Sequence, residues 1–159
     1  METNIYDLEP EPSLALYHRL IDLALERCPL ALLVLRPELE LTEVGQVVLG
    51  SLDPYVEERV KSTRWPGTDI FGTQADVFYF RLEAGSAKVL REATDHLFGW
   101  CQPDLPEDLC FLREDRRPWL VTIAHERDGY LVLSEWERMQ LVHVLPGLRV
   151  RSSESFSHE

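Results

Sequence analysis

The dipeptide His125-Glu126 comes closest in this chain to a metal or acid–base motif. The zinc-protease pattern HExxH needs a second histidine at position 129, which is glycine here, and the other histidines have no partner four residues away. Alternation along a strand predicted for residues 119–125 places His125 on the same face as Trp119. A neutral histidine is common on such a face, so we expect a structural role for His125.

Three cysteines, Cys28, Cys101 and Cys110, offer a nucleophile of another kind. Cys28 is predicted at a helix C-terminus, where the dipole disfavours a thiolate, and Cys110 is predicted on a core face. Cys101 lies in a loop and is the one thiol predicted to be exposed, but a nucleophilic cysteine also needs a base. We expect structural roles for all three. The chain has no CxxC pair, GxSxG elbow or phosphate-binding loop, so the sequence predicts no metal, cofactor or serine chemistry.

Two acidic clusters and one tryptophan are the candidate partner-binding residues. The clusters lack the spacing of a calcium loop. They are either solvated loop charges or patches that attract the arginines and lysines of a partner. The tryptophan lies in the Gly/Pro/Thr-rich segment RWPGTDIFGTQ and is either an exposed hot spot or a lid over the end of a sheet. The candidates are Asp104, Glu107, Asp108, Glu38, Glu40 and Trp65.

The overall charge limits the kinds of partner. Sixteen Lys and Arg against 28 Asp and Glu give a formal net charge of −12. Such a surface repels phosphate backbones and anionic membranes, and it attracts basic proteins. The longest apolar run, Pro29–Leu35, is too short to span a bilayer, and the acidic start of the chain is unlike a signal peptide. The three cysteines cannot all pair within one chain. Together, these features predict a cytoplasmic protein.

The elements that must position these residues follow from periodicity and turn signals. Helices are predicted from caps and three- and four-residue repeats over 13–27, from 42, over 55–62, 86–98 and 134–144. Strands are predicted over 30–35, 76–82, 109–113, 119–125 and 130–133, with turns at 114–117 and 127–129.

Consecutive strands with short turns late in the chain predict an α+β fold, with an antiparallel sheet, a C-terminal three-stranded meander and helices packed against it. At this length we expect a single domain over 13–148, a flexible acidic arm over 1–12 and a flexible tail over 149–159. The strand order and the oligomeric state are left open by the sequence.

A short acidic α+β chain carrying LPEDLCFLRED…PWLVTIAHERDGYL resembles small, poorly characterised bacterial proteins, some of which are immunity proteins to secreted or contact-delivered toxins. The resemblance covers mainly residues 100–136 and transfers no functional residue. It implies a non-enzymatic inhibitor that occludes a toxin's active site or target-binding face. The alternative is a small enzyme or ligand-binding protein with a pocket near His125 and the 65–73 loop.

Overall fold

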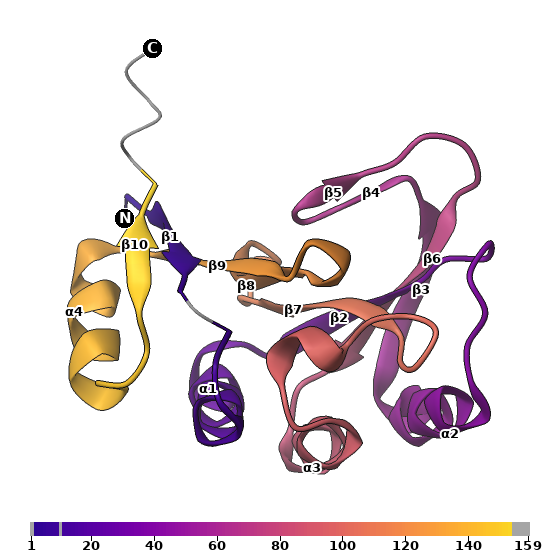
Figure 1. Cartoon of the computed structure of the whole chain (residues 1–159), viewed down its shortest axis with the longest axis horizontal. Coiled ribbons are helices and arrows are strands. Elements are labelled where there is room, and N and C mark those ends of the chain that lie inside the picture. The colour runs from indigo at the N-terminus through magenta and orange to yellow at the C-terminus, as the bar shows by residue number, and fades with distance from the viewer. Residues whose placement is uncertain (1, 10, 154–159) are drawn as a thin grey trace.

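The computed structural model, which describes residues 2–9 and 11–153, is built around an eight-stranded sheet (Figure 1). Its helices are α1 (Leu14–Arg27), α2 (Glu43–Leu52), α3 (Ala84–Ala93) and α4 (Glu135–Val144). Its strands are β1 (Asn4–Leu8), β2 (Leu30–Leu35), β3 (Val56–Ser62), β4 (Arg64–Trp65), β5 (Thr68–Asp69), β6 (Ala75–Arg81), β7 (Glu107–Leu112), β8 (Pro118–Ile123), β9 (Asp128–Leu133) and β10 (Val150–Ser152).

The large sheet has the order β10-β1-β9-β8-β7-β2-β6-β3, and each neighbouring pair is antiparallel. Helices α1, α3 and α2 lie on one side of it, the β4–β5 hairpin lies on the other, and α4 lies beside β1 and β10 (Figure 1). The predicted α+β fold, with its meander of β7, β8 and β9, is therefore confirmed. Among the described residues, no helix is long and apolar enough to cross a membrane.

Most helix starts follow the predicted capping residues. The side chains of Ser13, Thr42 and Ser134 each accept a backbone N–H of the first turn that would otherwise be unpaired. Helix α3 differs from the prediction of 86–98. It starts at Ala84, because Glu83 is the N-cap and Ser86 completes its capping box, and it ends at Ala93.

Two hydrophobic cores lie on opposite faces of the sheet. The larger one, on the helix side, buries Tyr17, Phe111 and Trp119 with the leucines of α1. The smaller one lies beneath the β4–β5 hairpin, where Trp65 covers Cys110 and Val121. A register shift between Phe111 and Leu112 disturbs the β7–β8 pairing, so Cys110 lies in the smaller core and Trp119 in the larger one, although strict alternation would place them on the same face.

The predictions of an irregular arm over 1–12 and an irregular tail from 149 are also corrected. Tyr6 and Leu8 are buried, and β1 pairs with both β9 and β10. The Tyr6-Asp7-Leu8 alternation is a short strand pattern that the acidic residues and prolines around it conceal. Of the predicted tail, residues 154–159 lie outside the described residues, as do residues 1 and 10 of the predicted arm.

The surface helix predicted over 55–62 is the edge strand β3 in the structure. The Asp53-Pro54 start signal forms only a short 3₁₀ turn, Asp53–Tyr55. The following residues alternate between half-buried and exposed, and they pair with β6. The pattern has a period of two, which is that of a strand. Pairing with β6 therefore outweighs the helix start signal at Asp53-Pro54.

The turn between β8 and β9 lies earlier in the chain than predicted, and this changes the position of His125. The predicted Asp128-Gly129 turn lies inside β9, and the chain reverses in a 3₁₀ turn, η3 (Ala124–Glu126), that ends at Arg127 with φ 51°. His125 is therefore outside the strand, and it is exposed instead of packed beside Trp119. The other predicted loop, 114–117, joins β7 to β8 as expected.

Candidate functional site

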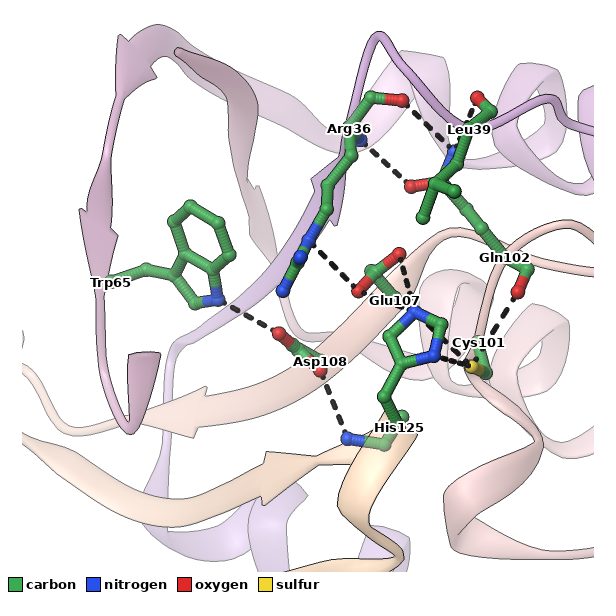
Figure 2. Close-up of polar contacts among 9 residues, drawn as sticks. Arg36, Leu39, Trp65, Cys101, Gln102, Glu107, Asp108 and His125 are labelled. Atoms are coloured by element: carbon green, nitrogen blue, oxygen red, sulfur yellow. Dashed lines mark hydrogen bonds and ion pairs between the residues drawn. The ribbon is translucent and has the colours of Figure 1, made fainter. Parts of the chain in front are cut away.

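A cluster of polar side chains gathers where β2 ends, β7 begins and η3 turns (Figure 2). Arg36 follows β2, and Glu107 and Asp108 open β7. The other residues of both strands are apolar, so the sheet fixes the backbone positions of these three residues. Cys101 lies in the loop after the 3₁₀ turn η2 (Leu97–Gly99), and Trp65 belongs to β4. We call this set the β7 cluster: Arg36, Trp65, Cys101, Glu107, Asp108 and His125.

Glu107 is the centre of the β7 cluster and has no exposed surface. One of its carboxylate oxygens lies 3.2 Å from Arg36 Nε and 3.2 Å from His125 Nε2. Burial first, and then the neighbouring Asp108, raise the pKa of Glu107, while Arg36 and His125 act in the opposite direction. A carboxylate loses its hydration when it is buried, and a nearby positive charge, here that of Arg36, offsets this loss.

Asp108 is buried beside Glu107 but is satisfied by uncharged donors. It accepts Trp65 Nε1–H at 2.9 Å and the backbone N–H of Ala124 at 3.0 Å. Its backbone has φ 58°, a conformation that aspartate tolerates better than most residues and that is uncommon outside glycine. The register of β7 against β2 shifts at this point, which turns the Asp108 side chain toward the hairpin and the η3 turn.

Cys101 and His125 meet at the exposed side of the β7 cluster. Cys101 Sγ lies 3.6 Å from His125 Nδ1 and 3.8 Å from Nε2, within the range of a sulfur hydrogen bond. His125 Nε2 also lies 3.3 Å from the second Glu107 oxygen, so the imidazole lies between the thiol and the carboxylate (Figure 2). Cys28 and Cys110 are buried, whereas Cys101 is partly accessible.

The electrostatic environment keeps this thiol protonated at rest. Burial first, and then three nearby carboxylates, raise the pKa of Cys101; the carboxylates are those of Glu107, Asp108 and Asp104. Their negative charges disfavour a free thiolate. The arrangement therefore has the order of groups found in a Cys–His–acid site, without a preformed thiolate–imidazolium pair.

Two loops are joined beside the β7 cluster by Gln102. Its side chain accepts the Arg36 N–H at 2.7 Å and donates to the Leu39 carbonyl at 3.0 Å. A groove runs along this junction between the start of α2 and the end of α3. Its lining includes Thr42, Val44, Phe98, Cys101, Asp104 and Leu105.

The six residues predicted to bind a partner divide into two groups of three. Glu107, Asp108 and Trp65 are buried, and the Trp65 indole donates to Asp108, so the exposure expected of these three residues is not observed. The lid interpretation of Trp65 is the one that fits its position. Asp104, Glu38 and Glu40 are exposed, as a surface role requires.

The sequence alone did not identify Arg36 or the approach of Cys101 to His125. One signal was available, because Glu107 and Asp108 open a strand whose remaining residues are apolar, and buried carboxylates need partners. The partners themselves come from segments distant in sequence. Within residues 2–9 and 11–153, no group of three or more His, Cys, Asp or Glu side chains is arranged to hold a metal ion.

Comparison of the chain with protein-family models, with curated proteins and with solved structures finds no match. The function proposed below is therefore based on the geometry and charge of the molecule itself.

Proposed function

We propose that this protein is a binding module that captures a basic protein partner on an acidic surface around the start of α2. In its most specific form the proposal is an immunity-type inhibitor, which neutralises a toxin domain by occluding it. We name this surface the α2 face and define it by Glu38, Glu40, Glu43, Val44, Val47 and Asp104.

The α2 face is continuous although two chain segments build it. The Thr42 N–H donates to the Pro103 carbonyl at 2.8 Å, and the Thr42 hydroxyl donates to the Asp104 carbonyl at 3.3 Å. Gln102 adds its bond to Leu39. These hydrogen bonds join the loop before α2 and the loop before β7 into one surface.

The observation that carries the proposal is the absence of positive charge from both segments. Residues 37–58 and 92–112 contain no lysine or arginine. Several acidic side chains elsewhere are paired with cations: Asp76, for example, contacts Arg59 and Lys61. The nearest cation in sequence, Arg36, is already paired with Glu107. The α2 face therefore carries negative charge that a basic partner would neutralise, and this charge would accelerate its capture.

Two exposed valines add an apolar contact to this charge. Val44 and Val47 lie on α2 with 69% of their surface accessible each, and Val44 also lines the groove beside Cys101. Apolar residues surrounded by polar ones are typical of the centre of a protein interface. They favour a partner with an apolar residue among its arginines or lysines.

A second group of exposed apolar residues, on α4, fits a basic partner less well. Trp136 and Met139 are exposed there. The acidic residues of α4, however, are internally paired, Glu135 with Arg138 and Glu137 with Arg113. That surface offers little free negative charge.

The predicted pocket between His125 and the 65–73 loop is the less favoured alternative. The Trp65 indole is bonded to Asp108, and the Arg36 guanidinium lies 5.5 Å from the centre of its ring. The polar edge and the face of the Trp65 ring are therefore engaged within the protein and are less available to a ligand of that pocket.

The test is a kinetic binding experiment with the purified product of the gene adjacent to this one. We expect a tight one-to-one complex whose association rate falls steeply as salt rises, because steering by surface charge is screened. The variant E38Q/E40Q/D104N should associate more slowly by about tenfold or more at low salt.

A matched variant, E2Q/E26Q/E114Q, removes the same amount of charge from exposed positions outside the α2 face. It should associate at close to the wild-type rate. Equal slowing in both variants would show that only net charge matters, and weak binding that is independent of salt would overturn the proposal.

A further inference from the structure

We infer that Cys101, His125 and Glu107 form a nucleophilic thiol site that accepts an acyl group from a cationic acyl compound lying in the adjoining groove. This inference goes beyond partner binding and does not depend on it. It is carried by the positions of the three side chains, by the accessibility of one thiol among three, and by the lining of the groove.

The geometry supplies a nucleophile, a base and a group that orients the base. His125 Nε2 lies 3.2 Å from one Glu107 oxygen and 3.3 Å from the other. Cys101 Sγ lies 3.6 Å from Nδ1 and 3.8 Å from Nε2, and Nδ1 is the ring nitrogen that the carboxylate does not contact. Glu107 is itself fixed by Arg36 at 3.2 Å. A carboxylate in this position holds the imidazole in one orientation and stabilises the imidazolium that forms when it takes a proton.

The charges around Cys101 determine how the thiol is activated. Because burial and, after it, the neighbouring carboxylates raise the pKa of Cys101, a free thiolate is disfavoured and Cys101 remains an S–H group at rest. His125 must therefore remove the proton as the sulfur attacks, in the way that histidine activates a serine hydroxyl. Reactivity then depends on His125 at neutral pH and not on a permanently lowered thiol pKa.

The proposed step is an acyl transfer without oxidation or reduction. The Cys101 S–H proton moves to His125 as an Sγ–C bond forms at the carbonyl carbon. The bond from that carbon to its leaving group breaks, and the leaving alkoxide or thiolate takes the proton from His125 and departs as an alcohol or thiol. Water then attacks the resulting thioester, which releases a carboxylic acid and restores the S–H group.

The groove indicates the class of acyl compound. Cys101 lines it together with apolar side chains such as Val44, Phe98 and Leu105, and with the carboxylate of Asp104. The sequence from 92 to 112 contains no lysine or arginine that would neutralise this negative charge. A small acyl compound with an apolar body and a cationic group matches this lining better than an anionic one.

The experiment uses acetylthiocholine, a cationic thioester, and ethyl thioacetate, its neutral counterpart. Mass spectrometry of the intact protein follows acetyl transfer to the chain, and peptide mapping assigns the site. We expect one acetyl group on Cys101, formed several-fold faster from the cationic reagent. Cys101→Ser should lose the adduct, and His125→Gln should slow its formation by about 100-fold or more.

Alkylation by iodoacetamide provides a second readout that does not need an acyl substrate. Cys28 and Cys110 are buried, so the folded protein should react at Cys101. At neutral pH the wild type should react faster than His125→Gln, and the two rates should converge at high pH, where the thiol ionises without a base. His143→Gln, an exposed histidine on α4, should match the wild type in both assays.

Equal alkylation rates in wild type and His125→Gln across the pH range would overturn the role of His125. A His125-dependent alkylation rate without any acetyl-protein would overturn the acyl class of substrate. Thermal melting of each variant identifies a loss that comes only from unfolding. None of these outcomes bears on the α2-face experiment, so the two proposals fail separately.

Discussion

Two neighbouring carboxylates, Glu107 and Asp108, are buried at the start of β7 and are stabilised in different ways. Glu107 is paired with the charged Arg36 and with His125, whereas Asp108 accepts hydrogen bonds from an indole and a backbone amide. By accepting these two hydrogen bonds, Asp108 holds the Trp65 ring and the η3 turn in place, and the η3 turn contains His125. Asp108 therefore shapes the site without facing its exposed side.

The hydrogen bond between Trp65 and Asp108 should contribute to the free energy of unfolding. Trp65→Phe keeps an aromatic ring in the lid but removes the N–H that Asp108 accepts, so the variant should lose about 1–3 kcal/mol of unfolding free energy. Urea denaturation measures the loss. Trp136→Phe, at a position 62% exposed, is the matched control and should change the value by no more than about 0.5 kcal/mol. A Trp65→Phe variant as stable as this control would mean that Asp108 is satisfied in another way.

At the scale of elements, Glu137 joins α4 to the β7–β8 hairpin. Its carboxylate accepts the Ser134 N–H at 2.9 Å and completes the capping box of the helix. It also accepts two hydrogen bonds from Arg113, at 2.9 and 3.0 Å. Burial raises the pKa of Glu137, but the hydrogen bonds from Arg113 and the Ser134 N–H outweigh it, and the pKa lies below its usual 4.5.

This shift predicts how the contribution of Glu137 to stability depends on pH. Because the folded-state pKa is lowered, the unfolded chain binds the proton more readily, and the contribution is lost as pH falls through the folded-state pKa. Glu137→Gln should therefore cost about 1.5–3 kcal/mol at pH 7. The difference from wild type should shrink below about pH 4.

Denaturant melts of both proteins over a pH series provide the measurement. Glu114→Gln, on the exposed loop of the same hairpin, should give a curve parallel to the wild type. A Glu137→Gln deficit that stays constant from neutral to acid pH would contradict the linkage.

The elements that could be predicted from sequence are those with local signals of their own. Ser13, Thr42 and Ser134 each cap a helix whose start the pattern marked. Strands β1, β3 and β10 were missed because each is short or partly polar, and its stability depends on a partner strand distant in sequence. The β7 cluster shares this property. Its members are brought together by sheet order, which periodicity does not encode.

For the molecule as a whole, the uneven distribution of charge has an energetic cost. The acidic residues of the α2 face come from two segments that contain no lysine or arginine, and the chain carries a formal net charge of −12. Like charges held together in the folded state repel one another more than they do in an extended chain. Binding surfaces often carry such a cost, since residues selected for recognition are not those that give maximum stability.

We therefore expect the E38Q/E40Q/D104N variant to melt at a higher temperature than the wild type at low salt. The gain should shrink at about 1 M salt, where screening limits charge interactions to about 3 Å. Thermal melts at the two salt concentrations test this. A lower melting temperature for the variant would mean that these carboxylates stabilise the fold, which would weaken the case for a surface reserved for a partner.

The position of β1 between β9 and β10 has a consequence for folding during synthesis. Tyr6 lies opposite Leu131 on one side and Ser152 on the other, so β1 leaves the ribosome long before either partner strand exists. Strands β2, β6, β3 and β7 have their partners much closer along the chain and form the opposite half of the sheet. That half is free to assemble while translation continues, because its loops are shorter to close. The edge that contains β1 is then completed last, and until that moment Tyr6 and Leu8 are apolar surface available to chaperones or to other nascent chains.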